Sequence, residues 1–85
     1  MSAHKDRLKK LRIRSWRRGI KEMDLILGGW SDAHLAFADE DTLDLYEALL
    51  SENDHDLYQW VSGQAAAPEH LSPLIARIAR ETEKV

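Results

Sequence analysis

The residues that could carry acid–base or metal chemistry are plentiful in this sequence, but their spacing does not form a catalytic site. The 85 residues include fifteen Asp or Glu, four His and no Cys. The lack of Cys excludes disulfides, thiolate catalysis and Cys-based zinc sites. The histidines are scattered, without metal-ligand spacing or a Ser–His–Asp set, at His4, His34, His55 and His70. We therefore predict no catalytic residues, no metal site and a protein that is not itself an enzyme.

The carboxylates and glycines are better explained by local structure than by catalysis. Many carboxylates fall where helices are expected to begin, and these positions favour caps and suit the helix dipole. The pair Gly28-Gly29 lacks the spacing of a Walker or dinucleotide-binding loop. His55 lies between Asp54 and Asp56, which fits a solvated turn. No residue is therefore assigned to bind a cofactor.

The most distinctive polar stretch runs from Arg17 to Asp24, where a basic opening segment gives way to an acidic remainder. Gly19 and Glu22 have the spacing of a helix N-cap and of the carboxylate that reaches back to it. The stretch therefore predicts one helix ending near Arg18 and another beginning at Gly19. The missing Cβ of Gly19 would also let another molecule approach the backbone closely, so a capping role and a binding role are both open.

Charge is unevenly distributed along the chain. Residues 1–22 carry nine Lys or Arg against Asp6 and Glu22, a net charge of +7, whereas residues 23–85 carry −10. This asymmetry suggests a basic surface for an acidic or phosphate-bearing partner. The same electrostatics would let the first helix lie on acidic helices of its own chain. Both interpretations stay open.

Helical periodicity accounts for most of the chain, and strand signals are nearly absent. The helices are expected at about Lys5–Arg17, Gly19–Phe37, Asp41–Ser51, Asp54–Ser62 and onward from Ser72. We expect the second to continue through Gly28-Gly29, although a glycine pair costs about 1–2 kcal/mol in a helix. The expected punctuation comprises a turn and cap cluster at Asp39–Asp41, a cap at Asn53 or Asp54, a C-terminal Gly63 and an N-cap pair Ser72-Pro73.

These elements predict one all-α domain, a compact bundle of about five short helices spanning residues 1–85. We expect a monomer whose residues 1–6 and 81–85 fray. The predicted core includes Leu27, Leu49, Leu57, Trp60 and Ile78, and Trp30 is assigned to it as well. Trp16, beside basic residues, fits the core and a binding face equally well.

A set of motifs gives the chain a family resemblance over about Leu11 to Ala79. Arg18-Gly19-x-x-Glu22, followed by Met23-Asp24-Leu25, resembles the signature of the SdhE-like flavinylation factors, the assembly factors of succinate dehydrogenase. Tyr46–Leu50 and Asp54–Trp60 resemble two further segments of that family, in the same order. The Gly28-Gly29-Trp30 segment departs from the pattern.

The resemblance implies a function that the residues alone do not. Family members bind the flavoprotein subunit of succinate dehydrogenase, and of related fumarate reductases, and promote its covalent attachment of FAD. The FAD belongs to the partner, so no stably bound cofactor is expected here. Carried over to this sequence, the partner-binding centre is Arg18, Gly19 and Glu22, with Arg18 offering its planar fork to a carboxylate or to backbone carbonyls. The expected flanking residues are Arg14, Trp16, Arg17 and Asp24.

The main alternative is a small basic-faced helical module that binds nucleic acid or has a regulatory role, since nine Lys or Arg among residues 1–22 would suit phosphate contacts. The pI near 5.7 and the lack of a clear helix-turn-helix argue against nucleic acid. No apolar run reaches the roughly 18–20 residues of a membrane span, and no signal-peptide core follows Met1. We therefore expect a bacterial cytoplasmic protein without membrane insertion.

Overall fold

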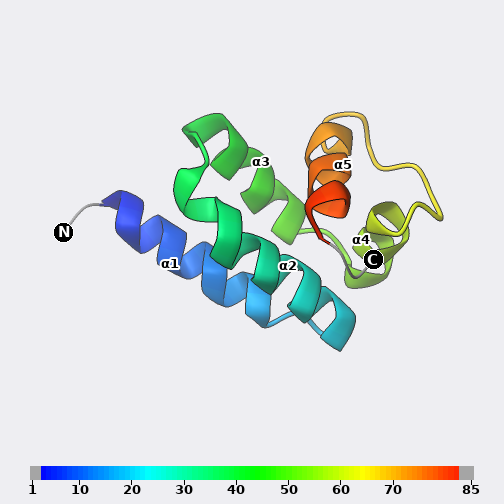
Figure 1. The fold of residues 1–85 in the computed structure, drawn as a ribbon, viewed down its shortest axis with the longest axis horizontal. Coiled ribbons are helices and arrows are strands. Elements are labelled where there is room, and N and C mark those ends of the chain that lie inside the picture. Colours follow the sequence, from blue (N-terminus) through cyan, green and yellow to red (C-terminus); the bar gives the residue numbers. More distant parts are fainter. Residues whose placement is uncertain (1–2, 83–85) are drawn as a thin grey trace.

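The computed structural model describes residues 3–82, and within that range all regular structure is helical (Figure 1). The elements are α1 (Ala3–Trp16), α2 (Lys21–His34), the short 3₁₀ helix η1 (Leu35–Phe37), α3 (Glu40–Leu50), α4 (Asp54–Val61) and α5 (Ser72–Glu81). The predicted all-α bundle of about five helices is confirmed. Of the ends expected to fray, 3–6 and Glu81 are helical here, while residues 1–2 and 83–85 lie outside the described part.

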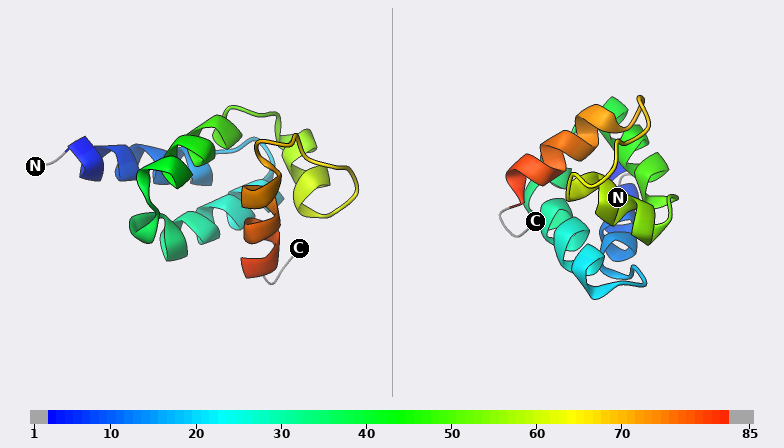
Figure 2. Two further views of the ribbon diagram at one scale, coloured as in Figure 1. Left: turned by 90° about the horizontal axis from the view of Figure 1, so that it is seen from above. Right: turned by 90° about the vertical axis from the view of Figure 1, so that its right-hand side faces the viewer.

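Two helix groups make up the bundle. α1 and α2 run side by side and are joined by the link at residues 17–20, whereas α4 and α5 lie together at the other end of α3 (Figure 1). The N-terminal turns of α1 project beyond the remaining helices (Figure 2). The bundle therefore measures 41 × 25 × 22 Å instead of being round.

A single apolar core joins all five α-helices. Its fully buried members include Leu11 from α1, Leu27 from α2, Leu49 from α3, Leu57 from α4 and Ile78 from α5. Four of the five predicted core residues are thus confirmed, and so is Trp30. Trp60 is only half-buried and packs against the edge of the core, because α4 is a short helix at the end of the bundle.

The α1–α2 contact is unusually close at one point, and it explains a glycine. A Cβ built on Gly28 would lie 2.2 Å from Cδ2 of the Trp16 ring, whereas one on Gly29 meets nothing within 4 Å. Gly28 therefore permits the indole of α1 to lie directly on the α2 backbone. α2 continues through both glycines, as expected, and η1 then completes the segment to Phe37.

Buried polar groups tie the first three helices together. The hydroxyls of Ser15 and Tyr46 lie 2.5 Å apart, Ser15 Oγ lies 2.7 Å from the Leu11 carbonyl oxygen, and the Tyr46 hydroxyl lies 3.2 Å from the Leu27 carbonyl oxygen, so two hydroxyl protons are shared among three contacts. Burial raises the pKa of Tyr46, because its phenolate would be desolvated. These bonds satisfy polar groups that would otherwise destabilise the core.

The last helix is fastened to α2 by a carboxylate. Glu81 Oε1 accepts from Nε1 of Trp30 at 2.9 Å and from Nε of Arg77 at 3.1 Å, and it lies 3.8 Å from Nε2 of His34. The Trp30 hydrogen bond, with the Arg77 and His34 charges, lowers the pKa of Glu81. The end of α5 is thereby held over the middle of α2.

The helix caps correct one prediction outright. α2 begins at Lys21 with Ile20 in the N-cap position and no side-chain cap, so the Gly19–Glu22 capping box is wrong. The reason is that the Gly19 N–H is taken by a residue from another helix, as described below. The Glu22 side chain makes no hydrogen bond within the part of the chain that the structure describes.

The remaining caps follow the expected chemistry with small shifts. Asp39 caps α3 by accepting from the Thr42 N–H at 2.8 Å, so that helix begins at Glu40 instead of Asp41. Asn53, not Asp54, caps α4. Gly63 follows α4 with φ of 84°, as a C-terminal glycine should. α5 starts at Ser72 with Leu71 as N-cap, one residue earlier than the predicted Ser72 cap.

Candidate partner-binding site

Arg18 is the centre of the link between α1 and α2, and its side chain faces inward. The Arg18 side chain is only 10% exposed, and its Nε lies 2.6 Å from Oδ1 of Asp54, whose side chain is 16% exposed. Its two terminal nitrogens donate to the backbone carbonyls of Leu50 and Glu52. The fork therefore joins the α1–α2 link to the segment between α3 and α4.

Gly19 shares the same carboxylate. Its backbone N–H donates to Oδ2 of Asp54 at 2.6 Å, so one carboxylate receives Arg18 on one oxygen and Gly19 on the other. A Cβ built on Gly19 would lie 3.3 Å from that Oδ2, which is a tight contact. Within residues 3–82 only Gly63 has positive φ, so space beside Asp54, not backbone conformation, favours glycine at position 19.

Asp24 holds the link from the other side. Its Oδ1 accepts the backbone N–H of Arg18 at 2.6 Å, and its own N–H donates to the Ile20 carbonyl at 3.0 Å. The Arg18–Asp54–Gly19 arrangement and the Asp24 bond are together called the link clamp below. Short charge-assisted hydrogen bonds of this kind fix geometry as well as adding stability.

The structure divides the predicted site residues into two groups. Arg18 and Asp24 support the link from within, and the carboxylate and carbonyls expected to meet the Arg18 fork come from this same chain. The exposed members are Gly19, Arg14, Trp16, Arg17 and Glu22. A partner can therefore reach the second group directly, whereas the first sets where that group lies.

Trp16 is partly packed against the protein and partly exposed, so its role on a binding face stays a prediction. One face of its ring covers Gly28, as the close Cβ contact shows, yet the side chain is 41% exposed. A groove of about 320 Å³ passes over the exposed part of the ring and is lined by Lys9, Arg12, Ile13, Trp16 and Arg17. This surface of α1 is thus apolar at its centre and basic at its rim.

The basic charge of α1 is used partly inside the chain. Arg7 lies 2.9 Å from Glu40, 2.7 Å from Asp44 and 3.2 Å from Glu47 of α3, and the Asp44 hydrogen bond raises the pKa of Arg7. Arg12 pairs with Asp32 at 3.1 Å. The intramolecular interpretation of the charge asymmetry therefore holds for Arg7 and Arg12, whereas the partner-binding interpretation stays a prediction.

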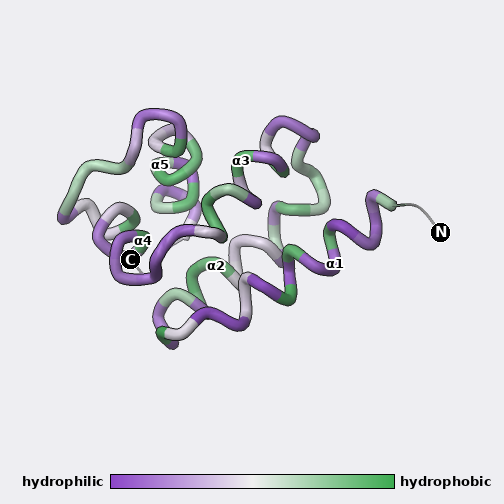
Figure 3. Tube along the Cα trace, turned by 180° about the vertical axis from the view of Figure 1, so that it is seen from behind, coloured by the Kyte–Doolittle hydropathy of each residue, from purple (hydrophilic) through white to green (hydrophobic). Residues whose placement is uncertain are grey.

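Other cations of the first 22 residues face solvent. Within residues 3–82 no ion-pair or hydrogen-bond partner contacts the side chains of Lys9, Lys10, Arg14, Arg17 and Lys21. The α1 trace is correspondingly hydrophilic over most of its length (Figure 3). These side chains are available to an anionic partner.

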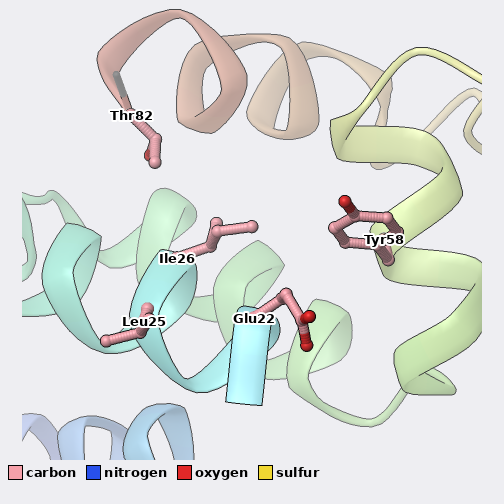
Figure 4. Close-up of a pocket in the computed structure, with 5 residues that line it drawn as sticks. All are labelled: Glu22, Leu25, Ile26, Tyr58 and Thr82. Atoms are coloured by element: carbon pink, nitrogen blue, oxygen red, sulfur yellow. The ribbon is translucent and has the colours of Figure 1, made fainter. Parts of the chain in front are cut away.

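The sequence did not reveal a second groove, between α2 and α4. It has a volume of about 270 Å³ and is lined by Glu22, Leu25, Ile26, Tyr58 and Thr82 (Figure 4). Leu25 is 54% exposed and Tyr58 is 36% exposed. Leu25 falls off the buried stripe of α2, and this departure from amphipathic spacing was the available signal.

The described part of the chain offers nothing for metal or membrane chemistry. Residues 3–82 hold no cluster of three His, Asp or Glu that could bind a metal ion. In the same range no helix is both long and apolar enough to cross a bilayer.

Comparison with known proteins gives a consistent result. Residues 9–82 match the family described as flavinator of succinate dehydrogenase. A Schizosaccharomyces japonicus protein named succinate dehydrogenase assembly factor 2, mitochondrial, is 38% identical over 75 residues, covering 88% of this chain and 51% of that protein. Its namesake from Drosophila grimshawi is 32% identical over 85 residues, covering 93% and 58%.

The same name is carried by a Candida glabrata protein, 45% identical over 53 residues, which cover 62% of this chain and 35% of that relative. The chain thus spans between about a third and three fifths of the length of these relatives. The family match extends through the link clamp and both grooves, since it includes every residue that lines them. By the extent of that match, the chain belongs to the family of succinate dehydrogenase flavinators.

Proposed function

We propose that this chain binds the flavoprotein subunit of succinate dehydrogenase and promotes the covalent attachment of FAD to it. The family description and the names of the relatives support this proposal. The observation that carries it is the link clamp, which fixes the exposed residues Arg17, Gly19 and Glu22 in one place. A pre-formed surface of this kind loses little entropy on binding.

The proposed mechanism needs no catalytic group on this chain. The flavin and the flavoprotein supply the chemistry of attachment, and this chain acts by binding one conformation of the flavoprotein more tightly than others. Such differential binding shifts the population toward the conformation that reacts. Its effect on the yield of flavinylated subunit is limited by the difference between the two affinities.

The contact surface consists of the exposed side of the link and the adjoining face of α1. Gly19 lets the partner backbone approach, Glu22 offers a carboxylate, and Arg14 and Arg17 offer cations without partners in residues 3–82. Trp16 supplies a rigid apolar anchor. Arg18 and Asp24 act as positioning residues.

The unpaired cations of α1 should also guide the encounter. Long-range attraction raises the association rate and weakens with salt, while dissociation changes less. Replacing Lys9 and Lys10 by Gln should slow association, and adding Arg12→Gln should slow it further, because each change lowers the net charge of α1 by one. Association rates that do not depend on ionic strength would contradict steering.

The nucleic-acid alternative has weaker support. Arg7, Arg12 and Arg18 are engaged by carboxylates of the chain itself, which leaves fewer cations for phosphates. Binding to nucleic acid is expected to be weak at physiological salt. A gel shift across salt concentrations tests this directly.

The function is tested in cells that lack their own factor and express the flavoprotein subunit. In-gel flavin fluorescence should show covalent flavin when this chain is supplied, both for succinate dehydrogenase and, where preference is to be tested, for fumarate reductase. Absence of fluorescence with normal abundance of the chain would refute the proposal. The relatives carry mitochondrial names, whereas we predict a bacterial cytoplasmic location for this chain. Cell fractionation of the organism that carries the chain tests this prediction.

Variants in the link separate binding from folding. Gly19→Ser adds atoms 3.3 Å from the Asp54 carboxylate, which must shift slightly, so the stability should change by about 1 kcal/mol or less. Flavinylation should nevertheless fall, as it should with Glu22→Ala. Ala36→Ser, an exposed change in η1 away from the link, is the control. Full flavinylation with both Gly19→Ser and Glu22→Ala, at normal abundance of each variant, would show that the link is not part of the contact surface.

A further inference from the structure

The groove between α2 and α4 has exposed polar groups without a protein partner in residues 3–82, beside an apolar floor. Glu22 and Ile26 from α2 face Tyr58 from α4 across the opening, with Thr82 after α5 on the third side (Figure 4). Ile26 is buried and forms the floor, whereas Leu25 is largely exposed at the rim. The groove therefore offers an apolar surface with a carboxylate and a phenol at its edge.

Neither polar group is used by the protein itself. Within the described residues, the Glu22 carboxylate and the Tyr58 hydroxyl contact no hydrogen-bond or ion-pair partner. The nearby carboxylates differ in this respect, because Asp24 accepts from Arg18 and Asp54 accepts from Arg18 and Gly19. An unpaired carboxylate beside an apolar surface is complementary to a cationic side chain with an apolar neighbour.

The size of the groove restricts what it can hold. Its volume of about 270 Å³ lies below the roughly 300–1,000 Å³ of typical small-molecule pockets. One or two side chains of a protein segment fit this volume better than a nucleotide or a flavin does. The groove also begins at Glu22, one helical turn beyond Gly19, so it continues the contact surface at the link.

We propose that this groove receives an arginine and an adjacent apolar residue from a segment of the partner protein. The inference rests on the proposed function, in which that partner is the flavoprotein subunit. The planar guanidinium forms a two-bond pair with the Glu22 carboxylate and stacks on the Tyr58 ring, while the apolar neighbour packs on Leu25 and Ile26. Lysine suits the site less well, because its ammonium offers neither the fork nor the stacking face.

The first test measures the affinity of the purified chain for the purified flavoprotein subunit. Glu22→Gln, Tyr58→Ala and Leu25→Ser should each weaken binding by about 5- to 30-fold, the range of an interface contact just below a hot spot. Phe37→Ser is the matched control, since Phe37 is 88% exposed and lies in η1, beyond the far end of α2. Circular dichroism melts confirm that every variant is folded.

The outcomes distinguish the two proposals. If the unmodified chain does not bind the flavoprotein, the proposed function fails and the groove assignment fails with it. If the unmodified chain binds but the three groove variants bind as tightly as Phe37→Ser, only the groove assignment is overturned. Sedimentation velocity tests a second copy as the occupant: a dimer that Tyr58→Ala dissociates would also overturn it.

The second test identifies the occupant. A photo-crosslinking residue, p-benzoylphenylalanine, in place of Leu25 should capture a flavoprotein peptide that contains an arginine beside an apolar residue. Replacing that arginine by Gln should weaken binding, and combining it with Glu22→Gln should add little further loss, as expected for directly coupled residues. A captured peptide without arginine, no captured peptide from a variant that still binds, or fully additive losses would overturn the assignment.

Discussion

Removing the Asp54 carboxylate should destabilise the protein more than any other single change of a polar side chain near the link. Its Oδ1 lies 2.6 Å from Arg18 Nε and its Oδ2 lies 2.6 Å from the Gly19 nitrogen. Asp54→Ala would leave a guanidinium that is only 10% exposed without its counter-ion and would free the Gly19 N–H. Both losses act on the same segment, so they cannot be relieved independently.

The expected cost follows from these partners. Removing one partner of a buried ion pair costs about 3–5 kcal/mol. The cost should be lower here, because the Asp54 side chain is 16% exposed and Arg18 would keep its hydrogen bonds to two backbone carbonyls. We therefore expect a loss of about 2–3 kcal/mol. For a domain of 85 residues, whose total stability should be about 4–13 kcal/mol, this lowers the melting temperature by about 10–20 °C.

Urea and thermal denaturation followed by circular dichroism measure this loss. Asp56→Ala is the control: Asp56 is also in the first turn of α4, but its side chain makes no hydrogen bond or ion pair within residues 3–82. Both variants remove the same charge from the same helix end, so the dipole contribution is matched. Asp54→Asn, which keeps one acceptor oxygen, should fall between them. Equal melting temperatures for Asp54→Ala and Asp56→Ala would refute the structural role of the clamp.

Two further predictions concern packing and pH. Gly28→Ala should destabilise the fold by about 1–3 kcal/mol, because its Cβ would overlap the Trp16 ring. Gly29→Ala is the control: its Cβ would meet nothing within 4 Å, so the change should be neutral or stabilising by up to about 1 kcal/mol. Equal effects of the two variants in urea denaturation would contradict the close α1–α2 contact. The pKa of Glu81 is lowered from 4.5 by the Trp30 hydrogen bond, so its contribution to stability is present above that value and is lost as pH falls through the lowered pKa. The stability difference between the natural chain and Glu81→Gln, measured by thermal melts from about pH 6 to about pH 3, should therefore shrink on acidification, and a constant difference would contradict this role.

The helices were predictable because each is specified by its own residues. The three- and four-residue spacing of apolar side chains identified all five, and Asp39, Asn53 and Gly63 marked ends by local chemistry. α2 ran through its glycine pair as expected, although the reason lay in tertiary packing. The sequence could not show that Gly28 was a contact with Trp16.

The candidate site was predictable only as a set of residues, not as an arrangement. Gly19 and Glu22 matched a capping box locally, but the Gly19 N–H was claimed by Asp54, which is 35 residues away. In the same way, the Arg18 guanidinium pairs with the carboxylate of Asp54, which is 36 residues further along the chain. Spacing within one helix gives no information on such partners. The groove at Tyr58 was missed for the same reason, since it exists only where α2 and α4 meet.

The sharing of Asp54 between Arg18 and Gly19 makes the position of the link depend on a residue about 35 positions further along the chain. The clamp joins the first quarter of the chain to the start of α4, so the link has no fixed position until α4 has docked. A nascent or partly unfolded chain would display the same exposed residues without their geometry. Under the proposed function, partner recognition would therefore be conditional on a finished fold, because an incomplete chain would lack the geometry of the contact surface.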